Sequence, residues 1–168
     1  MKKRIQLRVN GMDRALEVEA RSSLLEVVRE QFELTGAKLG CDMQVCGACT
    51  LLVNGKPVSA CSVLAVDADG CDVLTIEGLG DGKKHHPLQE AFMEFGALQC
   101  GYCTSGVYSY RQGAARRVSP TDGGAQKGNH GGLPLHRYDL FFTAPRTRRR
   151  MQENSMEPAD IGKTFRRG

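Results

Sequence analysis

The chain has 168 residues, of which 40% are hydrophobic and 25% are charged. This is ordinary globular usage at a length that allows one or two small domains, and it excludes fibrous and membrane-protein classes. The basic start, MKKRIQLRV, runs directly into apolar/polar alternation, so we expect no signal peptide, no membrane span and a cytoplasmic protein. Charge is divided unevenly: residues 1–107 carry 11 Lys/Arg against 14 Asp/Glu, and residues 108–168 carry 12 against 5.

Turn signals and alternating apolar residues predict strands in the first eighty residues. Asn10-Gly11 and Asn54-Gly55 are dipeptides typical of tight hairpin turns. The predicted strands flank these turns and follow the Asp69-Gly70 turn, at residues 5–9, 16–18, 50–53, 58–62 and 73–77.

One helix is predicted between the two hairpins. Ser23 with Glu26 three residues later forms a capping box, and Thr35-Gly36 ends the pattern. The apolar residues between them share one helical face, at Leu24, Val28 and Phe32. The order ββαβββ predicts an α+β sheet with one helix packed across it.

The chain changes after this sheet. Residues 78–84 form a glycine-rich linker, and Pro87 suits the first position of a helix whose face carries Leu88, Phe92 and Phe95. Beyond Val107 the periodicity vanishes. We therefore predict a sheet domain over 1–79, the start of a helical domain over 85–107, and a disrupted, poorly ordered basic segment over 108–168.

Three cysteines lie within the stretch GCDMQVCGACT. Cys41-x4-Cys46-x2-Cys49, followed by Cys61 after eleven residues, has the spacing of a plant-type [2Fe-2S] site, in which four thiolates hold two irons. Gly40 and Gly47 let the loop curl tightly, so that backbone N–H groups point at sulfur.

Other interpretations of the seven cysteines remain open at this point. A reducing compartment favours metal ligands or redox groups over disulfides. The four thiols could hold a structural zinc ion or stay unliganded, and Cys71 is predicted to be a structural or surface thiol. A second pair, Cys100 and Cys103 in QCGYCTSGV, cannot complete a cluster with two thiolates alone.

Together, CDMQVCGACTLLVNGKPVSAC and QCGYCTSG closely resemble the iron–sulfur small subunit of the molybdenum hydroxylases, the xanthine dehydrogenase, carbon monoxide dehydrogenase and aldehyde oxidoreductase family. The resemblance covers residues 3–107. It implies a ferredoxin-like β-grasp domain and a helical, four-helix-bundle-like domain with a second [2Fe-2S] cluster, held by Cys100, Cys103 and a later Cys-Arg-Cys-Thr-Gly-Tyr. It also implies that Gln99 contacts the molybdopterin cofactor.

The resemblance further implies a function. Electrons pass from molybdopterin on a large subunit, through the clusters of this chain, to FAD on a medium subunit, and the substrate reacts on the large subunit. The alternatives are a free-standing ferredoxin-type carrier and a disabled subunit without the second cluster.

The family pattern fails after Cys103, because no Cys-x-Cys pair follows. Residues 111–117, written in GC-rich codons and displaced by one base, permit Ala-Lys-Ala-Leu-Leu-Asp, and residues 133–137 permit Cys-Arg-Cys-Thr. Both motifs suit the family at this spacing, so we predict a frame-shifted segment at about 108–137. The alternative is a disordered basic tail that binds nucleic acid through Arg148, Arg149 and Arg150. The run of these three arginines has no interleaved aromatics, and we expect no nucleic acid partner.

Nucleotide sequencing of codons 108–137 checks this interpretation. We expect the codons for residues 133–137, displaced by one base, to encode Cys-Arg-Cys-Thr. The codons of residues 1–107 serve as the control, because their displaced frame should contain no family motif. A displaced frame without cysteines would remove the frame-shift hypothesis.

Overall fold

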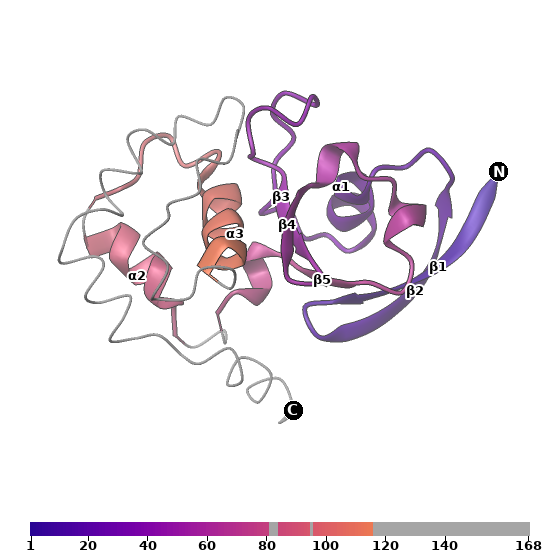
Figure 1. Cartoon of the computed structure of the whole chain (residues 1–168), viewed down its shortest axis with the longest axis horizontal. Coiled ribbons are helices and arrows are strands. Elements are labelled where there is room, and N and C mark those ends of the chain that lie inside the picture. The colour runs from indigo at the N-terminus through magenta and orange to yellow at the C-terminus, as the bar shows by residue number, and fades with distance from the viewer. Residues whose placement is uncertain (81–83, 95, 116–168) are drawn as a thin grey trace. The chain divides into compact units, whose positions relative to one another are not determined.

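The computed structural model of the protein describes residues 1–80, 84–94 and 96–115 (Figure 1). The described residues fall into two compact units. The first consists of Met1–Leu79 together with residues 101–115, and the second lies within Gly80–Cys100. All strands and helix α3 belong to the first unit, which therefore carries most of the fold described below.

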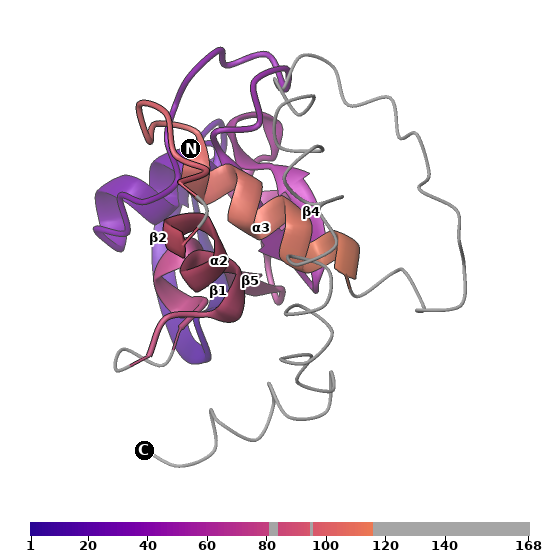
Figure 2. The ribbon, with the colours of Figure 1, turned by 90° about the vertical axis from the view of Figure 1, so that its left-hand side faces the viewer.

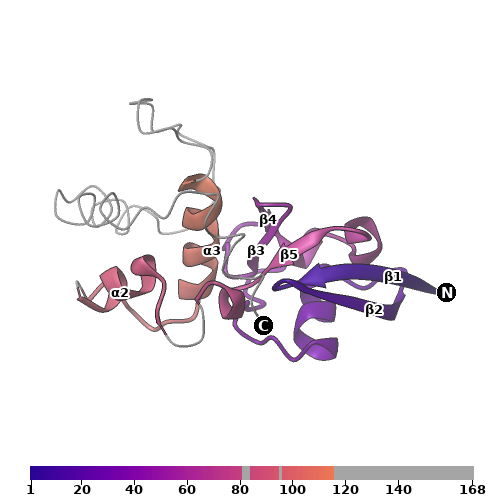
Figure 3. The same ribbon diagram turned by 90° about the horizontal axis from the view of Figure 1, so that it is seen from below.

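A mixed five-stranded sheet forms the first unit (Figure 3). The strands are β1 (Lys2–Val9), β2 (Met12–Glu19), β3 (Thr50–Val53), β4 (Lys56–Ser59) and β5 (Asp72–Leu74), in the order β2-β1-β5-β3-β4. The central pair β1–β5 is parallel, and all other neighbours are antiparallel. This is the mixed sheet of an α+β fold of the β-grasp kind, as predicted.

The helical elements are short. They are α1 (Leu24–Glu26), its π-helical continuation η1 (Val27–Gln31), the 3-10 turns η2 (Ala60–Ser62), η3 (Ala65–Ala68) and η4 (Ile76–Gly78), and the helices α2 (Pro87–Glu94) and α3 (Thr104–Ala115). None of the helices within the described ranges is long and apolar enough to cross a bilayer.

The predicted capping box starts α1. The Ser23 Oγ accepts the Glu26 N–H at 3.1 Å, and the Glu26 carboxylate accepts the Ser23 N–H at 2.7 Å. Leu24 and Val28 are fully buried in the core. The helix ends earlier than predicted, at Gln31, because Glu33 adopts a left-handed backbone with φ 57°.

One hydrophobic core lies between the sheet and α1–η1. Alternate residues of β1 point into it, so the period-two pattern of the sequence is the pattern of burial. Its large buried aliphatic members come from β1, β2, α1, η1, β3 and β5: Ile5, Leu7, Val9, Val18, Leu24, Leu25, Val27, Val28, Leu51 and Val73.

The two predicted Asn-Gly turns hold the short strand β5. Asn10 and Asn54 both have positive φ, as tight hairpin turns require. The Asn10 Oδ1 accepts the Thr75 N–H at 2.9 Å, and the Asn54 Oδ1 accepts the Asp72 N–H at 2.9 Å. Each turn therefore fixes one end of β5 through a side chain as well as through the backbone.

Two predicted strands differ from the observed ones. The second hairpin strand runs over Lys56–Ser59, and Cys61 lies in the 3-10 turn η2 rather than on a strand. Strand β5 ends at Leu74 because the Thr75 N–H bonds to Asn10 Oδ1 instead of a neighbouring strand. The strand β1 with which β5 pairs ends at the same level, in the Asn10-Gly11 turn.

The prediction that regular structure stops near residue 107 is wrong for residues 108–115. Helix α3 continues to Ala115 and packs against β3 and β4 (Figure 2). Its buried face mixes apolar and polar side chains, at Val107, Tyr108, Ser109 and Gln112. Such a face lacks an apolar period and gives no helical signal. The predicted segment beyond 115, including the frame-shift motif at 133–137, lies outside the described residues.

The second unit contains helix α2 in its described part. Pro87 begins the helix as predicted, and Leu88 and Phe92 are buried, whereas Phe95 lies outside the described residues. The His86 Nδ1 accepts the Leu88 N–H at 3.2 Å, and burial lowers the pKa of His86. His86 thus caps a helix. A four-helix-bundle-like domain is not established by this one helix and stays a prediction.

Replacing Asn10 tests how the turn holds β5. Asn10→Gly permits the positive φ but leaves the buried Thr75 N–H without its acceptor, so we expect a loss of about 1–3 kcal/mol in the free energy of unfolding. Urea unfolding of the full chain measures it. Asn54→Gly is the control, with a smaller loss because Asp72 is exposed. A stability of Asn10→Gly equal to that of the wild type would contradict this account of the turn.

Candidate iron–sulfur site

The four predicted cluster ligands come from one loop and one turn of the first unit. Cys41, Cys46 and Cys49 lie on the segment of residues 36–49, called the cluster loop below, and Cys61 lies in η2. The hairpin register pairs Thr50 with Ser59, and the Ala60 N–H donates to the Cys49 carbonyl at 3.3 Å. The β3–β4 hairpin therefore brings the distant Cys61 beside Cys49.

The cluster loop directs backbone N–H groups at the sulfur of Cys41. The N–H groups of Met43, Val45 and Cys46 lie 3.4, 3.3 and 3.2 Å from the Cys41 Sγ. Positive φ values at Asp42 and Gln44 allow this curl, in the manner of an anion-binding nest. These hydrogen bonds lower the pKa of the Cys41 thiol to about 7, from an ordinary value near 9.0.

The environment of Cys49 has the opposite effect. Burial raises the pKa of the Cys49 thiol to about 11; the Cys61 N–H opposes this rise, and the thiols of Cys61 and Cys46 add to it. The Cys46 thiol also acts on Cys41, because its side-chain hydrogen bond lowers the pKa of the Cys41 thiol. The four sulfurs are thus neighbours in the series Cys41, Cys46, Cys49, Cys61.

The glycines singled out in the sequence make room for this arrangement. A Cβ on Gly40 would lie 2.7 Å from the Cys46 Sγ, closer than real Cβ atoms come to other atoms. Gly47 has φ 68°, a left-handed conformation that glycine adopts without strain. Any larger residue at position 40 would displace the Cys46 sulfur.

The donor set fits an iron–sulfur cluster. Four neighbouring thiols with N–H groups aimed at sulfur supply both the ligands of such a cluster and hydrogen bonds to a ligating sulfur. No group of three or more His, Cys, Asp or Glu side chains in the described part of the chain is arranged around a single metal ion. Cys71 lies apart from the four and accepts a bond from the Asn54 amide at 3.3 Å.

The predicted second site is described only in part. Gln99 and Cys100 are exposed at the end of the second unit, and Cys103 is half-buried immediately before α3 in the first unit. The Cys103 carbonyl accepts the Val107 N–H at 3.1 Å. No cysteine follows Cys103 in the sequence, so the pair has two of the four thiols that a cluster requires.

Sequence reasoning missed the residues that support the cluster loop. Arg29 donates from Nη1 to the carbonyls of Thr35 and Ala37 at 2.9 and 2.7 Å. Tyr102 and Ser105, which precede or begin α3, donate to the carbonyls of Leu39 and Gly36, each at 2.6 Å. These contacts join segments up to 69 residues apart, and no local pattern in the sequence signals them.

Comparisons with known families agree with this chemistry. Residues 12–89 match the family described as "2Fe-2S iron-sulfur cluster binding domain", and residues 75–127 match that described as "[2Fe-2S] binding domain". The chain is therefore similar to iron–sulfur proteins over both halves of its described part.

Individual relatives show which iron–sulfur proteins this chain is similar to. The chain is 51% identical over 102 residues to the aldehyde oxidoreductase iron–sulfur-binding subunit of Escherichia coli (strain K12), a match that covers 61% of this chain and 44% of that protein. It is 36% identical over 133 residues to a probable xanthine dehydrogenase subunit of Bacillus subtilis (strain 168), covering 79% and 76%. The chain thus spans less than half the length of the first of these relatives.

A solved structure extends the likeness to the fold. The crystal structure of quinoline 2-oxidoreductase from Pseudomonas putida 86 contains a chain with a TM-score of 0.77 and 35% identity, covering 92% of this chain and 99% of that one. The mixed sheet of the first unit and its four neighbouring thiols together define the class of protein, which is a [2Fe-2S] protein. The chain belongs to the family of iron–sulfur small subunits of the molybdenum hydroxylases.

The two thiol environments predict different reactivity in the metal-free full chain. Since the thiolate is the nucleophile, alkylation of Cys41 should rise through a pH of about 7, and Cys49 should stay unreactive until far higher pH. Pulsed iodoacetamide labelling with fragment mass spectrometry separates the two sites. Cys41→Ser should remove the low-pH phase. Faster labelling of Cys49 than of Cys41 would contradict the assignment.

Proposed function

We propose that this chain is the electron-transfer subunit of a molybdenum hydroxylase complex. The observation that carries the proposal is the set of four neighbouring thiols with three N–H groups on the Cys41 Sγ. Cys41, Cys46, Cys49 and Cys61 hold the first [2Fe-2S] cluster. When bound, the cluster supplies one-electron oxidation and reduction, at a potential of roughly −400 mV for the plant-type spacing, tuned by its surroundings.

The partners are a large subunit with molybdopterin and a medium subunit with FAD. Relatives named as aldehyde oxidoreductase, xanthine dehydrogenase and nicotine 6-hydroxylase subunits support such a complex. Gln99 contacts the molybdopterin cofactor, and the substrate is bound by the large subunit. The complex lies in the cytoplasm, where reducing conditions keep the seven thiols open.

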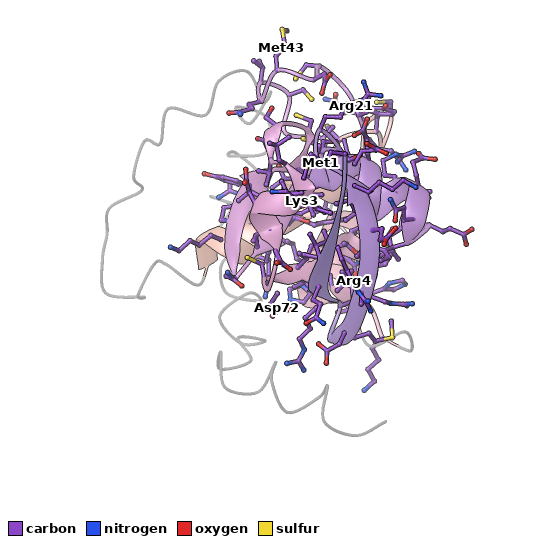
Figure 4. All side chains as sticks on the ribbon, turned by 90° about the vertical axis from the view of Figure 1, so that its right-hand side faces the viewer. Met1, Lys3, Arg4, Arg21, Met43 and Asp72 are labelled. Atoms are coloured by element: carbon purple, nitrogen blue, oxygen red, sulfur yellow. The ribbon has the colours of Figure 1, made fainter. Side chains whose placement is uncertain are left out.

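Exposed apolar side chains around the cluster loop favour a lasting complex over a free-standing carrier. Leu39, Met43 and Val45 are 50%, 69% and 43% exposed, and Met43 projects from the loop into solvent (Figure 4). Apolar surface of this kind suits a permanent interface, whereas short-lived electron-transfer encounters use smaller contacts. A partner subunit that covers this loop would also shield the cluster from water.

This proposal has two forms, a complete subunit with two clusters and a disabled subunit with one. Cys100 and Cys103 begin its ligand set, and the sequence carries no further cysteine to complete it. In the alternative form, a chain with these cysteines alone holds one cluster and is a disabled subunit, because electrons from molybdenum have no second cluster to pass through. An uninterrupted reading frame over 108–137 would restore the complete subunit.

Iron and acid-labile sulfide analysis of anaerobically purified protein tests the first cluster. We expect about two irons and about two sulfides per chain, and a single [2Fe-2S] signal in electron paramagnetic resonance after reduction. Cys41→Ser should lose this signal, and Cys71→Ser, the matched control outside the site, should keep it. Zinc without sulfide would contradict the proposal, and about four irons per chain would contradict the single cluster. Co-purification with molybdopterin and FAD proteins distinguishes a subunit from a free-standing carrier.

A further inference from the structure

Hydrogen bonds join the start of helix α3 to the part of the cluster loop that precedes Cys41 in the sequence. The Tyr102 hydroxyl donates to the Leu39 carbonyl, and the Ser105 hydroxyl donates to the Gly36 carbonyl, each at 2.6 Å. Leu39 stands two residues before Cys41. These bonds fix the entry of the cluster loop relative to α3.

Gly106 contacts the part of the cluster loop that follows Cys41 in the sequence, at Gly47 and Ala48. A Cβ at this position would overlap the Gly47 carbonyl oxygen and lie 3.0 Å from the Gly47 carbonyl carbon and 3.1 Å from the Ala48 Cα. All three are backbone atoms, so no side-chain rotation can relieve the overlap. Helix and loop therefore touch backbone to backbone, which only glycine at position 106 permits.

The Gly47 carbonyl cannot move aside freely. It accepts the Thr50 N–H at 3.1 Å and the Thr50 hydroxyl at 2.7 Å, and Thr50 is the first residue of β3. A group added at position 106 would push against a carbonyl that the sheet already holds. The displacement would then fall on the preceding part of the loop, where Cys41 and Cys46 lie.

We propose that Gly106, with Tyr102 and Ser105, is a positioning device for the first cluster. None of the three is among the proposed ligands of that cluster. By pressing α3 onto Gly47 and Leu39, they keep the N–H groups of Met43, Val45 and Cys46 directed at the Cys41 Sγ. This inference rests on the proposed function, because its effect is measured on the cluster that the loop holds.

The physical consequence concerns both potential and retention of the cluster. Hydrogen bonds to a thiolate sulfur stabilise the more negative, reduced state, so their loss lowers the reduction potential. Outer-shell partners of a metal site typically change its affinity by about 10–100-fold. We therefore expect Gly106→Ala to lower the potential and to release iron to a chelator about 10-fold faster.

Gly113 offers a matched control on the same helix. A Cβ there would lie 2.7 Å from the Pro57 Cδ and 2.8 Å from the Leu52 Cδ2, on β4 and β3, away from the cluster loop. Gly113→Ala thus adds the same methyl group and the same gain in helix propensity, with a clash against side-chain atoms rather than against the backbone of the cluster loop. It should destabilise the protein without shifting the potential of the cluster.

The experiment compares these variants of the full chain in two states. In the cluster-loaded protein, a potential titration followed by paramagnetic resonance should show a more negative potential for Gly106→Ala and an unchanged one for Gly113→Ala. In the metal-free protein, hydrogen exchange at the amides of Met43, Val45 and Cys46 should accelerate in Gly106→Ala alone. If Gly106→Ala does not fold, the same two measurements are made on Tyr102→Phe and Ser105→Ala, which each remove one hydrogen bond.

The outcomes separate the two proposals. A wild-type chain that binds no [2Fe-2S] cluster overturns the proposed function. A wild-type chain that binds the cluster, with equal potentials and exchange rates in the Gly106, Tyr102 and Ser105 variants, overturns the positioning role. Equal shifts in Gly106→Ala and Gly113→Ala would also overturn it, because they would reflect general loss of stability.

Discussion

Holding four thiols together is the constraint on which the rest of the first unit depends. Ionised sulfurs at such spacing repel one another, and burial adds to the cost at Cys49. The N–H groups around Cys41 offset part of this cost, but they require left-handed backbone at Asp42 and Gln44, at about 1–2 kcal/mol each. Such a loop persists only because its surroundings fix it, through Arg29 on one side and the start of α3 on the other.

The sheet serves this loop by fixing the β3–β4 hairpin. Strand β5 lies between β1 and β3 and is only three residues long, so side chains from both hairpin turns hold its ends. Through β5 the first hairpin fixes the level of β3, and the register of β3 with β4 then places Cys61 beside Cys49. The fourth ligand is thus positioned by strand pairing across the whole sheet.

Helix α3 relates the two groups of cysteines. It begins directly after Cys103 and packs on β3, β4 and the cluster loop, so a residue of the second cysteine pair is joined to the scaffold of the first. Packing at Gly106 and Gly113 requires glycine where the helix alone would favour alanine.

The sequence alone determined the features that follow from local chemistry. Asn-Gly turns, the Ser23–Glu26 capping box and the alternation in β1 follow from short-range preferences, and the spacing of Cys41, Cys46 and Cys49 indicated the cluster loop. The tertiary structure alone decided the end of β5, the 3-10 turn at Cys61 and the continuation of α3 through residues 108–115. Each depends on partners distant in the chain: Asn10 for Thr75, Cys49 for Cys61, and the sheet for a helix face without an apolar period. Local patterns record only what neighbouring residues require, and these features arise from contacts that exist only once the sheet has formed.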